Sequence, residues 1–266
     1  ELRIEDRPRP DAVASRAMRR VLLLAYYFPP SVDAGAKRPL GFFRHLAAHG
    51  WEPTVLTVRA GNYATAGGAA EPDPPGVVRV PETRFPWQRH APAGRAEDAA
   101  PRGAAPGLLR RLVRSALYVP DAWRGFHAPA LAMARRLHAV RRFDAVWTTS
   151  SPWTLLRTGA ALRRDGLPWA ADLRDLWTDN HFGHPHGALR RALDRTLERR
   201  WLGAASAVTV ATPGLAARLA ERHIGPAADV VPNGFLAEES EVATAAGRER
   251  PRRETFRVVF TGKLYD

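Results

Sequence analysis

The stretch Arg20-Val21-Leu22-Leu23-Leu24-Ala25-Tyr26-Tyr27 decides the fold class of this 266-residue chain. An unbroken apolar run of this length is typical of a strand that is buried on both faces of a parallel sheet. Pro29-Pro30 ends the run, a helix is expected over residues 36–48 with Gly50 as its stop, and residues 53–58 suit a second strand. This pattern predicts a strand–helix–strand unit with a right-handed crossover.

The same alternation resumes in the second half of the chain. Strands are expected at residues 77–80, 144–149, 168–173, 206–211 and 229–231, and helices near 131–138, 153–164, 188–201 and 213–222. In the helix at 188–201, the spacing of Leu189, Leu193, Leu197 and Trp201 predicts a buried apolar stripe. We therefore predict an α/β fold with a doubly wound, Rossmann-like parallel sheet.

The order of these segments also predicts a domain organisation. Residues 1–19 form a basic, Pro-rich leader, and residues 20–236 form the Rossmann-like domain with a long loop at about 59–106. A linker is expected at 237–254, and 255–266 is expected to be the first strand of a second, truncated domain. A lone strand is not stable by itself, which is why we expect a partner domain.

Composition limits the function classes. The formal net charge of +13 favours anionic partners, although an Arg-rich composition spread along the chain explains the same number. The absence of cysteine excludes disulfides, thiolate chemistry and zinc–sulfur sites. No apolar run approaches 18 residues, so we expect a cytoplasmic protein without a signal peptide or membrane span.

Polar residues that follow predicted strands are the candidates for chemistry, because ligands of open α/β sheets bind beyond the carboxyl ends of the strands. Gly35 would let the backbone approach a ligand closely. Lys37 and Arg38 fall in the first turn of the next helix, where cations oppose the helix dipole and a bound anion would offset that penalty. Two solvated basic side chains are the alternative interpretation of this pair.

A second cluster follows the strand at 168–173. Two carboxylates, Asp172 and Asp175, flank Arg174 there, and Asp179 comes four residues later. Such a group can position hydroxyls and stabilise developing charge, although an Arg–Asp pair that only shapes the loop is the alternative.

The third candidate segment is Thr149-Ser150-Ser151-Pro152. Its hydroxyls could bind a ligand, but Ser151 before Pro152 is better explained as a helix N-cap. His184 and His186 are too isolated to suggest a metal site, so no metal and no cofactor are expected.

In this order and spacing the segments resemble glycosyltransferase family 4, whose members have the two-domain GT-B fold. The resemblance is carried by Tyr26-Tyr27-Phe28-Pro29-Pro30 with Gly35, Asp172-Leu173-Arg174-Asp175-Leu176-Trp177, Ala207-Val208-Thr209-Val210-Ala211-Thr212-Pro213-Gly214, Val230-Val231-Pro232-Asn233-Gly234-Phe235 and Val258-Val259-Phe260-Thr261-Gly262-Lys263-Leu264-Tyr265. It implies retaining transfer of a sugar, without a metal, from a nucleotide-diphosphate donor to an acceptor hydroxyl in polysaccharide or lipid-linked glycan synthesis. The chain would then be the amino-terminal, acceptor-side domain plus the first strand of the donor domain, and these 266 residues alone would not transfer sugar.

The resemblance also implies roles for particular residues. Arg174 and Asp175 occupy the neighbourhood where many members carry a catalytic His, at the exit of the fifth strand. Residues expected to contact the acceptor are Asp172, Asp179, Ser150, Lys37 and Arg38, and those expected near the donor phosphates are Gly35, Gly262 and Lys263.

Two further expectations concern partners. Basic amphipathic segments at Arg110–Arg114 and Arg135–Arg142 suggest peripheral docking on an anionic membrane, on the inner face of the cell membrane. The alternative function is a basic module that binds nucleic acid or another anionic surface. Most Trp residues fall at apolar periodic positions and not where bases could stack, so nucleic acid is not the expected partner.

Overall fold

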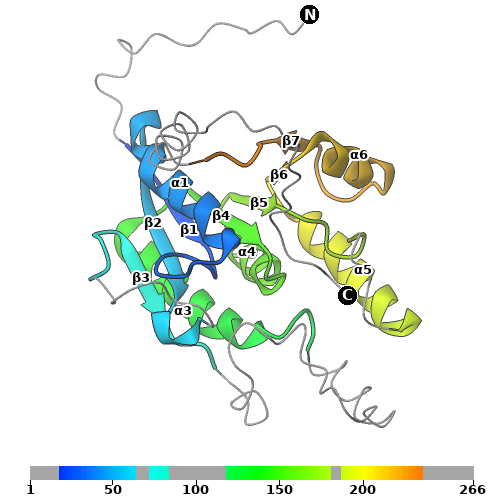
Figure 1. Cartoon of the computed structure of the whole chain (residues 1–266), viewed down its shortest axis with the longest axis horizontal. Coiled ribbons are helices and arrows are strands. Elements are labelled where there is room, and N and C mark those ends of the chain that lie inside the picture. Colours follow the sequence, from blue (N-terminus) through cyan, green and yellow to red (C-terminus); the bar gives the residue numbers. More distant parts are fainter. Residues whose placement is uncertain (1–17, 64–71, 84–117, 181–186, 236–266) are drawn as a thin grey trace, which may run out of the picture. The chain divides into compact units, whose positions relative to one another are not determined.

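In the computed structural model, residues 18–63, 72–83, 118–180 and 187–235 are described, and they contain one sheet of seven parallel strands (Figure 1). The strand order is β3-β2-β1-β4-β5-β6-β7. The strands are β1 (Arg19–Leu24), β2 (Trp51–Val58), β3 (Val77–Val80), β4 (Ala145–Ser150), β5 (Trp169–Leu173), β6 (Ala207–Val210) and β7 (Ala228–Val230). The predicted doubly wound parallel sheet is confirmed, and the predicted strands that fall among the described residues lie within about three residues of their expected places.

Helices connect the strands on both faces of the sheet. They are η2 (Ala34–Ala36), α1 (Lys37–His45), η3 (Leu46–His49), η4 (Ala60–Asn62), η6 (Arg124–Phe126), α3 (His127–Arg141), α4 (Thr154–Arg164), α5 (Ala188–Leu202) and α6 (Pro213–Glu221). The expected helix at 36–48 is therefore a short 3-10 turn, an α-helix and a second 3-10 turn in succession. Gly50 ends it with a φ of 76°, a left-handed conformation that favours glycine.

Alternation along the central strand β1 divides the core into two layers. Leu22 and Leu24 belong to the larger core, which is covered by α3, α4, α5 and α6. Val21 and Leu23 belong to the smaller core on the opposite face, which α1 covers. Side chains on both faces of β1 are buried, which explains the continuous apolar run that identified this strand.

Helix α5 confirms only half of the apolar stripe that its sequence predicts. Leu189 is 88% exposed and Leu193 is 43% exposed, whereas Arg190, Asp194, Glu198 and Leu202 form the buried stripe. This stripe contains charged residues because they pair with each other and with segments outside the helix. Arg190 pairs with Asp194 at 2.8 Å and donates to the carbonyls of Tyr118 and Pro120. Leu197 and Trp201 pack against the larger core as predicted, whereas Leu189 and Leu193 are exposed. The predicted apolar stripe is therefore confirmed for its second half and wrong for its first half.

The predicted N-cap of α4 is also wrong. No side-chain cap comes from the residues just before α4, and the carboxylate of Asp121 takes this place. It accepts from the Thr154 backbone N–H at 2.9 Å and from the Thr154 hydroxyl at 2.6 Å. Asp121, which lies 33 positions before Thr154 in the sequence, therefore caps the helix in place of Ser151.

The chain divides into two compact units, Glu1–Asn233 and Gly234–Asp266. The leader at 1–19 except its last two residues, the helix expected around Arg110–Arg114, the linker and the strand expected at 255–266 all lie outside the described residues. Within the long loop expected at 59–106, the structure describes β3, η4 and their neighbours, and the other residues of that loop lie outside the described part.

Candidate functional site

The candidate site lies where β1, β4 and β5 end. These strands are neighbours in the sheet, and all three run in the same direction. The segments after them, Tyr26–Arg38, Ser151–Trp153 and Arg174–Asp175, therefore emerge at one edge. This is the edge at which open α/β sheets bind their ligands.

Gly35 and Arg174 are brought into contact at this edge. A Cβ atom on Gly35 would lie 2.8 Å from Nη1 of Arg174, 3.1 Å from its Nη2 and 3.1 Å from Cδ2 of Tyr27. Only glycine therefore fits against this guanidinium without displacing it. The two residues were predicted separately, one for donor phosphates and one for catalysis, and the structure places them side by side.

The Arg174 guanidinium is fixed by backbone carbonyls of the β4–α4 loop. Its Nε donates to the Ser150 carbonyl at 3.2 Å and its Nη2 donates to the Ser151 carbonyl at 3.0 Å. Burial lowers the pKa of Arg174, while the nearby carboxylates of Asp175 and Asp172 raise it. A guanidinium stays charged even so, and a charge held in a partly buried place acts on a neighbouring anion more strongly than one in water.

Asp172 and Arg38 form a buried pair beneath this loop. Arg38 Nε lies 2.9 Å from Oδ2 of Asp172 and Arg38 Nη2 lies 2.7 Å from Oδ1, so the pair is bidentate. The hydroxyls of Thr149 and Thr209 also donate to Asp172, at 2.8 Å and 2.6 Å. Because four protein donors surround a carboxylate with no exposed area, Asp172 orients Arg38 and joins β4, β5 and β6.

Arg38 also reaches the end of the first unit. Its Nη1 donates to the Pro232 carbonyl at 3.0 Å and to Oδ1 of Asn233 at 3.3 Å. Its guanidinium lies 5.4 Å from the centre of the Phe42 ring, a cation–π distance. Arg38 is therefore not a solvated basic side chain, which corrects the alternative interpretation of this residue. Its predicted contact with an acceptor stays a prediction.

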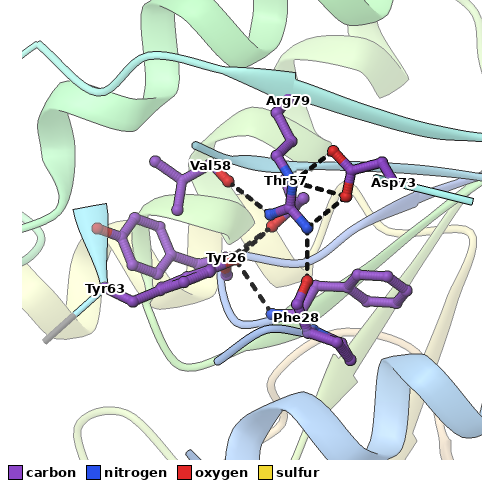
Figure 2. Close-up of polar contacts among 8 residues, drawn as sticks. Tyr26, Phe28, Thr57, Val58, Tyr63, Asp73 and Arg79 are labelled. Atoms are coloured by element: carbon purple, nitrogen blue, oxygen red, sulfur yellow. Dashed lines mark hydrogen bonds and ion pairs between the residues drawn. The ribbon is translucent and has the colours of Figure 1, made fainter. Parts of the chain in front are cut away.

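A second polar network holds the backbone that follows β1 (Figure 2). Arg79 of β3 pairs with Asp73 and donates to the carbonyls of Val58 at 3.0 Å and Pro29 at 2.5 Å. Arg79 thereby links the edge strand β3 to the loop that carries Gly35.

Tyr63 and Thr57 complete this network from β2 and the turn after it. Both hydroxyls donate to the Tyr26 carbonyl at 2.9 Å, and the Phe28 N–H donates to the Tyr63 oxygen at 3.3 Å. Burial raises the pKa of the Tyr63 phenol, so this group stays protonated and remains a donor. Figure 2 shows these side chains converging on the Tyr26–Phe28 backbone.

The other predicted site residues differ in their surroundings. Asp175 is exposed beside Arg174, and Lys37 is exposed at the start of α1. Asp179 pairs with Arg218 of α6 at 3.2 Å. Ser150 is fully buried, and its Oγ has no hydrogen-bond partner among the described residues. Gly262 and Lys263 lie outside the described residues.

Three residues that shape the site were not singled out from the sequence. Tyr27 packs against Gly35, Arg79 holds the loop before it, and Asp121 caps α4. The signal for Tyr27 was present in the Tyr-Tyr-Phe-Pro-Pro motif. Arg79 and Asp121 act on residues 50 and 33 positions away, so no local pattern points to them.

The described residues contain no group of three or more His, Cys, Asp or Glu side chains that could hold a metal ion. In the same part of the chain, no helix is both long enough and apolar enough to cross a bilayer.

Comparison with known proteins bears on this geometry. Residues 35–234 match the profile of the glycosyl transferase 4-like domain. The chain belongs to this family. The match begins at Gly35 and ends at Gly234, so it spans the whole sheet except β1. This confirms the family resemblance, and one half of a GT-B glycosyltransferase has the same Rossmann-like architecture. No curated protein sequence matches the chain significantly.

Solved structures with a similar fold are distant in sequence. A sucrose-phosphate synthase from Thermosynechococcus elongatus is 17% identical over 86% of this chain and 96% of its own, with a TM-score of 0.43. The calicheamicin glycosyltransferase CalG4 is 14% identical over 84% of this chain and 55% of its own, with a TM-score of 0.47. The trehalose-6-phosphate phosphatase N-terminal domain of Candida albicans is 14% identical over 86% of this chain and 54% of its own, also with a TM-score of 0.47. The chain thus spans about half the length of the last two.

Proposed function

We propose that this glycosyl transferase 4-like domain works in sugar transfer from a nucleotide-diphosphate sugar to an acceptor hydroxyl, with retention and without a metal. The observation that carries the proposal is the contact between Gly35 and the Arg174 guanidinium at the carboxyl end of the sheet. The family match supports the reaction class, and this contact supplies a fixed cation beside a loop that a ligand can approach closely.

The chemistry asked of these residues is electrostatic. In the transfer, the bond from the sugar's anomeric carbon to the diphosphate oxygen breaks, a bond to the acceptor oxygen forms, and the acceptor hydroxyl loses its proton. Negative charge grows on the departing diphosphate, and a preorganised guanidinium such as Arg174 stabilises that charge. The exposed carboxylate of Asp175 is our candidate to accept the proton.

The acceptor belongs to this domain in our proposal, and the donor belongs mainly to a second domain. Lys37, exposed at the start of α1, is expected to contact an acceptor, whereas Arg38 and Asp172 fix the start of α1 to β5 and to Pro232. A polysaccharide or lipid-linked glycan pathway is the expected setting. The 266-residue chain alone is expected to show no transfer.

The test compares alanine substitutions at two glycines, Gly35 and Gly41. In the full reading frame, Gly35→Ala would push a Cβ into the Arg174 guanidinium and is expected to lower kcat at least tenfold, because removing one preorganised donor typically costs about 10²–10³. Gly41→Ala is the matched control, since a Cβ there meets nothing within 4 Å and alanine favours a helix. Transfer from a panel of nucleotide-sugars is measured as product per enzyme per time, beside thermal unfolding of each variant.

Two outcomes would contradict these expectations, one for the Gly35–Arg174 contact and one for the proposed function. Equal transfer rates for the two alanine variants would exclude the proposed role of the Gly35–Arg174 contact. No transfer from any nucleotide-sugar by the full reading frame, together with no thermal shift by UDP, GDP or TDP, would contradict the function itself.

A further inference from the structure

Three tryptophan rings are stacked beside the loop that carries Arg174. The ring centroids of Trp153 and Trp177 lie 6.0 Å apart with an interplanar angle of 14°. Those of Trp177 and Trp201 lie 5.5 Å apart with an angle of 11°. Aromatic pairs at such distances attract each other beyond what the burial of their surface contributes. Trp177 is the middle ring and therefore contacts both of the others.

The first two rings belong to the two loops that Arg174 also joins. Trp153 is the last residue before α4, two residues after Ser151, and Trp177 lies in the β5–α5 loop, three residues after Arg174. Arg174 donates from Nε to the Ser150 carbonyl at 3.2 Å and from Nη2 to the Ser151 carbonyl at 3.0 Å. The two loops are thus connected twice, once by the guanidinium and once by the ring pair.

The backbone beside each of these two rings is held by a carboxylate. Directly after the first ring, the Thr154 N–H donates to Asp121 at 2.9 Å. Directly after the middle ring, the Thr178 N–H donates to Glu198 of α5 at 3.3 Å, and the Thr178 hydroxyl donates to the same carboxylate. Because both rings extend from backbone that is itself held, their contact fixes one loop relative to the other.

The chain between Arg174 and Trp177 is short. Only Asp175 and Leu176 lie between them, and Leu176 is buried in the larger core. A shift of the Trp177 ring would therefore move the backbone that carries the guanidinium. Catalysis depends on placement at this scale, since a misplacement of about 1 Å can lower a rate about a hundredfold.

We infer that Trp177 is a positioning residue for sugar transfer, and that it holds the Arg174 guanidinium in place by stacking on Trp153. The inference rests on the proposed function, because it concerns how Arg174 is placed for that reaction. Arg174 acts on negative charge that grows as the reaction proceeds. Loosening it should therefore lower kcat and leave KM nearly unchanged, whereas a stack that served stability alone would change neither in the folded protein.

Transfer kinetics in the full reading frame test the inference. Trp177→Leu removes the stack and is expected to lower kcat roughly tenfold or more, with KM within about threefold of the wild type. Trp177→Phe keeps an aromatic ring and is expected to restore kcat to within about threefold. Thermal unfolding verifies that each variant is folded at the assay temperature. If the leucine variant is not, Trp177→Met takes its place, because methionine fills irregular gaps in cores.

Trp147→Leu is the matched control. Trp147 is 7% exposed and Trp177 is 6% exposed, so the same substitution removes a tryptophan of the same burial. The Trp147 ring contacts the Phe42 ring, with centroids 4.8 Å apart, in the smaller core on the opposite face of the sheet. This variant is expected to be less stable than the wild type but to transfer sugar at the wild-type rate.

Two further measurements separate positioning from stability. In an Arg174→Lys background, Trp177→Leu is expected to change kcat by less than about twofold, because a residue that acts through Arg174 has nothing left to position. Hydrogen exchange of the Arg174 Nε–H is followed by NMR in the 266-residue chain with ¹⁵N-labelled arginine, and the signal is assigned by its absence in Arg174→Lys. Exchange is expected to be roughly tenfold faster or more in Trp177→Leu than in Trp147→Leu, since the bond to Ser150 opens more often.

The outcomes distinguish failure of the inference from failure of the proposed function. Transfer by the wild type with an unchanged kcat in Trp177→Leu, or with an equal loss in Trp147→Leu, would overturn the inference alone. A further large loss of kcat in the Arg174→Lys background would do the same. No transfer by the wild type would contradict the proposed function. Equal exchange rates in the two leucine variants would then show that Trp177 does not hold Arg174 either.

Discussion

At the scale of single residues, the site is organised by charges that the fold has placed beneath the surface. Asp172 holds Arg38 with both carboxylate oxygens, and Arg38 in turn holds the Pro232 carbonyl. The start of α1 and the end of the first unit are thereby fixed to the same carboxylate. Arg174 keeps its guanidinium against Gly35.

Removal of the Asp172 carboxylate should show how much the Asp172–Arg38 pair contributes to the free energy of unfolding. Asp172→Ala would leave Arg38 buried without its partner and two threonine hydroxyls without an acceptor, at a cost of about 3–5 kcal/mol in the free energy of unfolding. Asp165→Ala removes the partner of the exposed Arg135 and should cost about 0–1 kcal/mol, as surface pairs do. Urea unfolding measures both. Similar losses in the two variants would show that the buried pair contributes no more than a surface pair.

At the scale of elements, the strands were predictable, whereas the first half of the buried face of α5 was not. The strands that form the centre of the sheet, β1 and β4, are buried on both sides, so an apolar run identifies them without knowledge of their neighbours. A helix such as α5 has one buried face, and which face it is depends on what lies opposite. Arg190, Asp194 and Glu198 face inward because the carbonyls of 118 and 120, Thr178 and Arg222 are there to pair with them.

The same reason separates the predictable part of the site from the rest. Gly35 and Arg174 follow strands, so topology alone places them at the ligand edge. The contact between them, the Arg79 clamp on Pro29 and the Asp121 cap are made by residues far apart in the sequence. Such pairings depend on side-chain directions that spacing does not encode.

The N-terminus of α4 gives a direct test of one such pairing. Asp121→Ala is expected to cost about 1–2 kcal/mol of stability, because it removes the acceptor of the Thr154 N–H. Ser151→Ala is expected to change stability by about 0.5 kcal/mol or less, since its hydroxyl is not the cap. Chemical unfolding measures the loss of stability in each variant. A larger loss for Ser151→Ala than for Asp121→Ala would show that Ser151 is the cap after all.

The buried charged residues of α5 lead to a second prediction at this scale. Glu198 accepts from the Thr178 N–H at 3.3 Å, from its hydroxyl at 2.5 Å and from Arg222 at 3.1 Å. Glu198→Ala is therefore expected to cost about 3–5 kcal/mol, because it leaves Arg222 without its charged partner. Leu193→Ser should cost about 0.5 kcal/mol or less, as an exposed substitution does. If the leucine variant proved the less stable of the two, the charged stripe could not be the structural face.

At the scale of the whole molecule, charge that looks uniform in the sequence is sorted by the fold. The net charge of +13 is spread along the chain. Arg38 is buried on the carboxylate of Asp172, Arg174 is held by backbone carbonyls, and Arg135 of α3 pairs with Asp165 at the surface. Net charge alone therefore does not distinguish arginines that are paired within the protein from arginines at its surface.

The stability of the whole molecule should also depend on pH through His127. Burial, with the charges of Arg157, Arg135 and Arg164, lowers the pKa of His127 from 6.5 to about 4. Between these two values the unfolded chain takes up a proton that the native protein does not, so the free energy of unfolding must fall as pH falls from about 6.5 to about 4. Asp121 contributes with the opposite sign, because burial raises its pKa and the native carboxyl takes up a proton at higher pH than the unfolded one.

A substitution isolates the histidine from every other titrating group. His127→Asn keeps an amide that can donate to the Thr158 hydroxyl, 2.9 Å from the ring nitrogen, but it has no proton to gain. Unfolding by urea at pH 7, 6, 5 and 4.5 should show a smaller loss of stability for the variant than for the wild type over that range, because only the wild type must keep an imidazole neutral. Parallel losses in the two proteins would mean that His127 titrates alike in the folded and unfolded chains, and that its burial does not hold it neutral.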